Sequence, residues 1–150
     1  MSRKPLSAPG IHISVSAETL AELKNIYSDL EKQLHHFQAE CEICGKCCHF
    51  HSYGHELRLT QLELAYLIAC HGLRRPSRDG VCPYLEETRC TARDGRALGC
   101  RVYACGADKQ IVEDLYEQTF AKIRALAKRK QLPLVYEELL TALEEVAETN

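Results

Sequence analysis

The stretch Cys41-Glu42-Ile43-Cys44-Gly45-Lys46-Cys47-Cys48 decides how the rest of this chain is expected to fold. Four cysteines in eight residues keep four sulfurs close together whatever the backbone does. Neighbouring thiolates repel one another unless a positive ion lies between them, and a metal ion is the simplest such partner. We therefore expect a cysteine metal centre that fixes the loops around it.

Four more cysteines can complete such a centre: Cys82, Cys90, Cys100 and Cys105. They lie in residues 73–106, a stretch with turn signals and almost no helical periodicity. A loop-rich stretch of this length inside a small domain needs something to hold it. The metal-binding core is thus predicted to span 41–105, and its candidate ligands are Cys41, Cys44, Cys47, Cys48, Cys82, Cys90, Cys100 and Cys105.

Several features of this centre stay open at the level of sequence. The eight cysteines suffice for two four-ligand sites or for one site with spare thiols, and His49, His51 or His55 can replace a sulfur in either. The ninth cysteine, Cys70, follows the apolar run 64–69, so we expect it to be buried as a small hydrophobe outside the site.

Composition limits the compartment and the class of partner. The net charge of −2 gives no reason to expect nucleic-acid binding. No window approaches the roughly 18 apolar residues of a membrane span, and the first residues do not resemble a signal peptide. We therefore expect a cytoplasmic protein, in which clustered cysteines indicate metal or redox chemistry rather than disulfides. Basic residues beside the second cysteine group are expected to compensate thiolate charge.

The fold is predicted to be mostly α, as one small helical domain over 16–150 that follows a flexible lead-in over 1–15. Four segments show helical periodicity and none shows sustained alternation. A first helix should begin after Ser16 and bury a seam from Leu20 to Phe37, and a second should follow the capping box Thr60-Gln61-Leu62-Glu63 and stop at Gly72. A third should follow Asp108 and end before Pro133, and a last one should bury Tyr136, Leu139, Leu140, Leu143 and Val146.

Two metals compete for the cysteines. Zinc takes four tetrahedral ligands, and the adjacent pair Cys47 and Cys48 suits a single ion poorly. The run Cys41-x2-Cys44-x2-Cys47 matches the spacing of bacterial ferredoxins, and Cys82-Pro83 supplies a distant Cys-Pro. The spacing favours an iron–sulfur cluster, of the [4Fe-4S] type, over zinc.

The same residues resemble the YkgJ-like cysteine-cluster family, a family described as zinc- or iron-chelating. The resemblance rests on the C-x2-C-x2-C-C signature at 41–48, on Leu59-Thr60-x-x-Glu63, on Cys82-Pro83-Tyr84-Leu85, and on Cys100-Arg101-Val102-Tyr103-Ala104-Cys105. It covers about residues 41–105. Two stretches depart from the family pattern, namely Arg96-Ala97-Leu98-Gly99 and the residues after Cys90.

The resemblance implies metal binding rather than a defined reaction. The chain lacks the G-x-G-x-x-G, P-loop, G-x-S-x-G and H-E-x-x-H motifs, which favours a structural or protein-interaction module that a protein partner recognises. Two alternatives stay open. The signature also occurs in flagellin lysine-N-methylases, which implies an iron–sulfur enzyme or enzyme component by analogy, and the centre can also serve as a reversible metal sensor.

Overall fold

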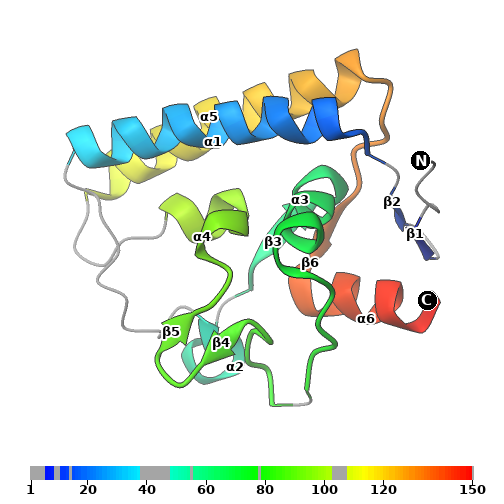
Figure 1. Ribbon diagram of the computed structural model, residues 1–150. Coiled ribbons are helices and arrows are strands. Elements are labelled where there is room, and N and C mark those ends of the chain that lie inside the picture. The colour runs from blue at the N-terminus through cyan, green and yellow to red at the C-terminus, as the bar shows by residue number, and fades with distance from the viewer. Residues whose placement is uncertain are drawn as a thin grey trace.

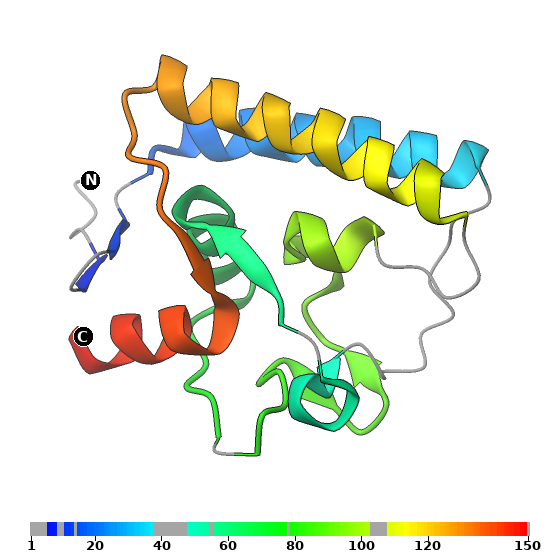
Figure 2. The same cartoon turned by 180° about the vertical axis from the view of Figure 1, so that it is seen from behind.

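A computed structural model describes residues 6–8, 11–13, 15–37, 48–54, 56–77, 79–102 and 108–149. Within these ranges the chain is mostly helical, as predicted (Figure 1). The two long helices, α1 (Ala17–His36) and α5 (Lys109–Arg129), lie side by side and run antiparallel (Figures 1 and 2). The shorter helices lie on one side of this pair, and they are α2 (Phe50–Tyr53), α3 (Gln61–His71), α4 (Leu98–Val102) and α6 (Leu139–Thr149).

The strands of the described residues form three two-stranded antiparallel sheets. These pair β1 (Leu6–Ala8) with β2 (Ile11–Ile13), β3 (Arg58–Thr60) with β6 (Tyr136–Glu138), and β4 (Leu85–Glu86) with β5 (Arg89–Cys90). In the β3–β6 sheet Leu59 lies opposite Glu137, so this pair joins the start of α3 to the start of α6. The 3-10 turn η2 (Arg93–Gly95) precedes α4.

Two hydrophobic clusters form the core, and α3 contributes to both. Leu62 and Tyr66 of α3 pack into the cluster between α1 and α5, which contains Leu23, Ile123 and Leu126. The second cluster includes the buried face of α6 and the cysteine-containing segments, together with Leu64, Ala65 and Leu67 of α3. This double contact explains why α3 is apolar on nearly all sides.

The predicted helix ends are confirmed where a side chain caps the backbone. The side chain of Ser16 accepts a hydrogen bond from the Thr19 N–H, and that of Asp108 accepts from Gln110 and Ile111. Thr60 and Glu63 form a complete capping box. Gly72 is the C-cap of α3, as expected from its position after the apolar run.

Other boundaries differ from the prediction. The segment expected to be a flexible lead-in contains the β1–β2 hairpin, which contacts α3 and α6. The first helix ends at His36, and Phe37, expected in its buried seam, is its C-cap with 46% of its surface exposed. The last helix begins at Leu139 because Tyr136–Glu138 pair with β3 instead. The loop expected at 49–59 contains α2 and the start of β3, and residues 73–106 contain the short helix α4.

Glu63 joins α1, α3 and α4 through its buried carboxylate. Its Oε1 accepts hydrogen bonds from the Tyr27 hydroxyl at 3.3 Å and from the Leu98 N–H at 2.7 Å, and its Oε2 accepts from the Thr60 N–H at 2.8 Å. Burial raises the pKa of Glu63, and these hydrogen bonds oppose the rise. The carboxylate therefore ties α1 and α4 to the first turn of α3.

None of the helices in the described ranges combines the length and the apolar character that a membrane span requires.

Candidate metal centre

The structure describes half of the predicted ligands. Cys48, Cys82, Cys90 and Cys100 lie in the described residues, whereas Cys41, Cys44, Cys47, Cys105 and His55 lie outside them. The four described ligand candidates come from the segment that leads into α2, the Cys-Pro turn, the strand β5 and the helix α4. No disulfide joins any two of the described cysteines.

Backbone hydrogen bonds place Cys82 beside Cys48. The Cys82 N–H donates to the Cys48 carbonyl oxygen at 2.8 Å, and His49 and Val81 form an antiparallel bridge next to it. The His51 N–H also donates to the Gly80 carbonyl oxygen, at 3.3 Å. The segment that begins at Cys48 is thus joined to the segment that contains Cys82 and Pro83.

Gly80 allows this close approach. Its φ of 71° lies in the left-handed region, and a Cβ added there would come 2.0 Å from Cγ of His51. Both the backbone conformation and the neighbouring ring therefore require glycine. The turn signal Arg78-Asp79-Gly80, read from sequence, thus has a specific role: it lets residues 80–82 lie against 48–51.

The β4–β5 hairpin carries Cys90 back toward the same place. The Thr91 N–H donates to the Tyr84 carbonyl oxygen at 2.8 Å, and the Leu85 N–H donates to that of Cys82 at 3.0 Å. The Tyr84 hydroxyl, on a side chain that is 1% exposed, donates to the Gly72 carbonyl oxygen at 2.7 Å. This bond fastens the hairpin to the end of α3, and burial raises the pKa of Tyr84 to about 12.

Four of the five described cysteines, those predicted to be ligands, belong to or pack against one hydrophobic cluster. Cys48 and Cys82 are buried within it, and the half-buried Cys90 and Cys100 pack against it. The Cys48 side chain also lies within hydrogen-bonding reach of the Cys90 sulfur. That contact, the Ala92 N–H and the charges of two arginines lower the pKa of Cys90 to about 6, against the burial that raises it.

Only part of the expected charge compensation is seen. The two arginines that lower the pKa of Cys90 are Arg96 and Arg93, as the prediction of basic residues around thiolates requires. Arg101 was expected to share this role, but its guanidinium ion-pairs with Glu31 at 3.0 Å and lies 3.8 Å from the ring centre of Tyr27. Its positive charge is thus paired with Glu31 in the contact between α4 and α1.

Within the described ranges, no three side chains of His, Cys, Asp or Glu are arranged to hold a metal ion. His51 is exposed and His49 is half-buried, and neither belongs to such a group. The described cysteines therefore form a partial donor set, and the other predicted sulfur ligands belong to residues 41–47 and to Cys105.

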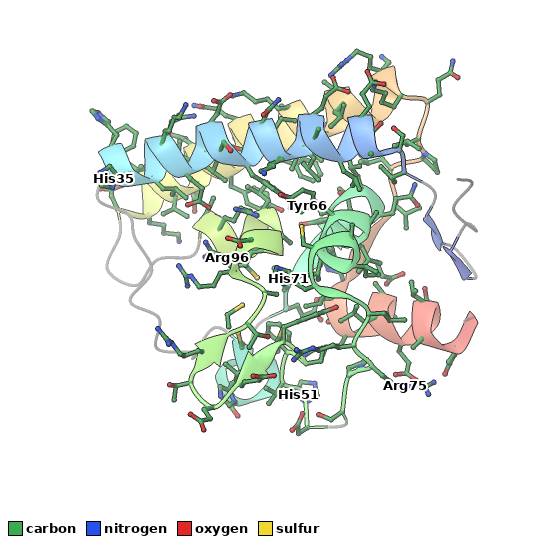
Figure 3. All side chains as sticks on the ribbon, viewed as in Figure 1. His35, His51, Tyr66, His71, Arg75 and Arg96 are labelled. Carbon is green, nitrogen blue, oxygen red and sulfur yellow. The ribbon has the colours of Figure 1, made fainter. Side chains whose placement is uncertain are left out.

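Sequence reasoning was wrong about Cys70 and missed its surroundings. Cys70 is exposed rather than buried, because the last residues of α3 extend beyond the core that covers its first two turns. Next to it, Nε2 of His71 accepts a hydrogen bond from the Gly95 N–H at 3.0 Å. Figure 3 shows Tyr66 and His71 on the side of α3 nearest α4, with Arg96 beside α4. In the sequence, only the adjacent titratable residues Cys70 and His71 at the end of this helix could have indicated these surroundings.

Searches against protein-family models, curated proteins and solved structures found no match to this chain.

Proposed function

We propose that this protein binds a metal centre through its cysteines, and that the centre fixes a structural or protein-interaction surface. The ligands come from Cys41, Cys44, Cys47 and Cys48 together with Cys82, Cys90, Cys100 and Cys105. The proposal agrees with the resemblance to the YkgJ-like family, which rests on the sequence motifs at 41–48, 59–63, 82–85 and 100–105.

One observation carries the proposal: four cysteines from separate segments belong to or pack against one hydrophobic cluster, and within it Cys48 lowers the pKa of Cys90. A single buried thiol packs like a small apolar residue, so the support for metal binding comes from the proximity of Cys48 and Cys90. Cys48, one of these four, is also the last cysteine of the 41–48 motif.

The donor set fits a metal that prefers sulfur. A thiol must lose its proton to become a ligand, and the lowered pKa of Cys90 favours that form at neutral pH. Bound there, a metal or cluster would link segments that are otherwise joined only by short hydrogen-bonded contacts. The chain's own part is to hold the thiolates together, exclude water by burial, and place Arg93 and Arg96 near the negative charge.

Between the two metals, the spacing Cys41-x2-Cys44-x2-Cys47 with a distant Cys-Pro supports an iron–sulfur cluster, preferentially [4Fe-4S]. In such a cluster each iron takes one thiolate, so the adjacent Cys47 and Cys48 need not share an ion. Protein purified without oxygen should then be brown, with broad absorbance near ~400 nm, and should contain iron and acid-labile sulfide. Colourless protein with stoichiometric zinc and no sulfide would replace the cluster by a zinc–cysteine scaffold.

Two single substitutions test the ligand assignment. Cys90→Ala should lower the metal content of the purified protein, because it removes a thiol from the cluster of cysteines. Cys70→Ala is the matched control, since it removes an exposed thiol outside that cluster and should keep the metal. Equal metal contents in the two variants would exclude Cys90 as a ligand, and metal-free wild-type protein would contradict the proposed function itself.

A further inference from the structure

An aromatic patch lies where the helix α5 meets the strand β6 (Figure 2). The rings of Tyr116 and Phe120 stack with their centres 6.0 Å apart, and the ring of Tyr136 meets that of Phe120 edge-on at 5.6 Å. The hydroxyls of Tyr116 and Tyr136 also share a hydrogen bond of 2.6 Å. We call these three residues the aromatic patch.

The aromatic patch is preformed and stays open to solvent in part. Tyr136 is 42% exposed, and Tyr116 and Phe120 are half-buried. The guanidinium of Arg124 lies 5.2 Å from the ring centre of Phe120, so it covers part of that ring with a charge rather than with apolar surface. Because the rings already hold one another, a partner that covers them has little side-chain freedom to remove.

Charged residues on the same side of α5 are sorted by sign. Residues spaced by three, four or seven positions share one face of a helix. On the face that contains Phe120, Glu113 and Glu117 lie toward the start of the helix, and Arg124 and Lys128 lie toward its end. All four side chains are exposed. We call this row the charged stripe.

The charged stripe is barely neutralised within the chain. Glu113 forms a single long ion pair, with Lys109 at 3.9 Å, and both side chains are exposed. Glu117, Arg124 and Lys128 form no ion pair with another described residue. Exposed charges of opposite sign, each confined to one half of the stripe, are therefore available to a partner.

The charged stripe is complementary to itself. Its two acidic and two basic residues are placed symmetrically about the point between Phe120 and Ala121. When two copies of α5 lie antiparallel across a two-fold axis at this point, each Glu117 faces Arg124 of the other copy, and the outer acidic residue faces the outer basic one. The ring of Phe120 then faces the small side chain of Ala121. A parallel arrangement would instead oppose like charges along the whole stripe.

We propose that this face of α5 is a dimer interface with a second copy of this chain. The aromatic patches supply apolar contact beside the axis, and the charged stripes fix the antiparallel register. Exposed ion pairs contribute little free energy each, and salt screens them. The dimer should therefore form reversibly, depend on protein concentration, and weaken when salt is added.

Sedimentation velocity of the full chain, under reducing conditions and over a range of concentrations, gives the dissociation constant of the dimer. Arg124→Glu opposes like charges twice in each dimer and should raise that constant about tenfold or more. Glu117→Arg should act in the same direction. The double variant, Glu117→Arg with Arg124→Glu, restores opposite charges and should return the constant to within about threefold of the wild type.

The matched control is Lys122→Glu. It makes the same change of charge at an exposed position on the other side of α5 and should leave the dissociation constant unchanged. Circular dichroism of each variant confirms that the helices are retained, so a change in association is not a loss of folding.

A chain that stays monomeric at every concentration would overturn the inference. So would equal dissociation constants for Arg124→Glu and Lys122→Glu, or a double variant that associates no better than the single ones. Metal content measured on the same samples keeps this result apart from the proposed function. A dimer without metal would contradict only the proposed function, because no candidate metal ligand belongs to this face of α5.

Discussion

The helical pair α1–α5 and the cysteine segment, residues 79–102, are built in opposite ways. In the helical pair, side chains spaced by three and four residues bury one face completely, so Leu23 and Ile123 are both 0% exposed. The cysteine segment has only two-residue strands, one 3-10 turn and one short helix. Buried Tyr84, Ala97 and Leu98 pack it into the core, and individual hydrogen bonds connect it to α3 and its cap. The comparison teaches that a repeated apolar stripe can hold the first region, whereas the second depends on a few individual links.

The largest effect should follow removal of the proposed metal. Chelation should loosen the cysteine segment while the helical pair keeps its structure, because the binding free energy of a structural metal is also folding free energy, on the order of 10 kcal/mol. Amide hydrogen exchange measures this difference directly. Equal loss of protection in residues 79–102 and in α1 and α5 would show that the two regions unfold as one unit.

A cavity in the helical pair should instead lower the stability of the protein and leave its metal content unchanged. Ile123→Ala removes a fully buried side chain and should lower the free energy of unfolding by about 2–5 kcal/mol. Denaturant unfolding measures the loss, and Lys122→Ala is the exposed control on the same helix. Metal content per folded protein should not change, and a loss comparable with that of Cys90→Ala would refute the separation of the regions.

A smaller effect should appear at the carboxylate that connects the regions. Glu63→Gln keeps the shape but replaces one oxygen with an NH2 group, which then faces N–H or O–H donors of Thr60, Leu98 or Tyr27. The expected loss is about 1–3 kcal/mol. Hydrogen exchange should show weakened protection at both α1 and α4, and a change confined to one of them would mean that Glu63 does not couple the regions.

The same variant has a defined pH dependence. Burial raises the pKa of Glu63 above its usual value of 4.5, so above that pH the unfolded chain has lost a proton that the folded chain still holds. The free energy of unfolding therefore falls as the pH rises through this window, and Glu63→Gln lacks that fall. The stability advantage of the wild type over the variant should thus shrink with rising pH between 4.5 and the raised pKa. A stability advantage of the wild type that grows with rising pH in this window would contradict the raised pKa of Glu63.

The parts of the fold that follow from sequence are those set by near neighbours. The caps at Ser16, Thr60 and Asp108 were predictable because each side chain bonds a backbone group two or three residues away. The strand Tyr136–Glu138 was not, since its partner β3 lies far earlier in the chain and its own residues also fit a helical face. The helix α4 is too short to show a period.

The site shows the same limit. Sequence names cysteines as ligands, but not that Cys48 meets Cys90, because this contact depends on the Gly80 turn and the β4–β5 hairpin together. Cys70 was assigned to the core because its neighbours in sequence are apolar. Whether the end of a helix is covered depends on what packs there, and residues far away in the chain decide that.

The β3–β6 pair has a consequence for how the protein folds during synthesis. The start of α3 depends on late residues, since the Gln61 N–H donates to the Val135 carbonyl oxygen at 3.0 Å and the Leu139 N–H donates to that of Leu57 at 2.9 Å. On the ribosome the cysteine segment therefore emerges before α3 can dock completely. During that interval its thiols are open to oxidation or to the wrong metal, so the timing of metal delivery during synthesis should determine the yield of correctly assembled protein.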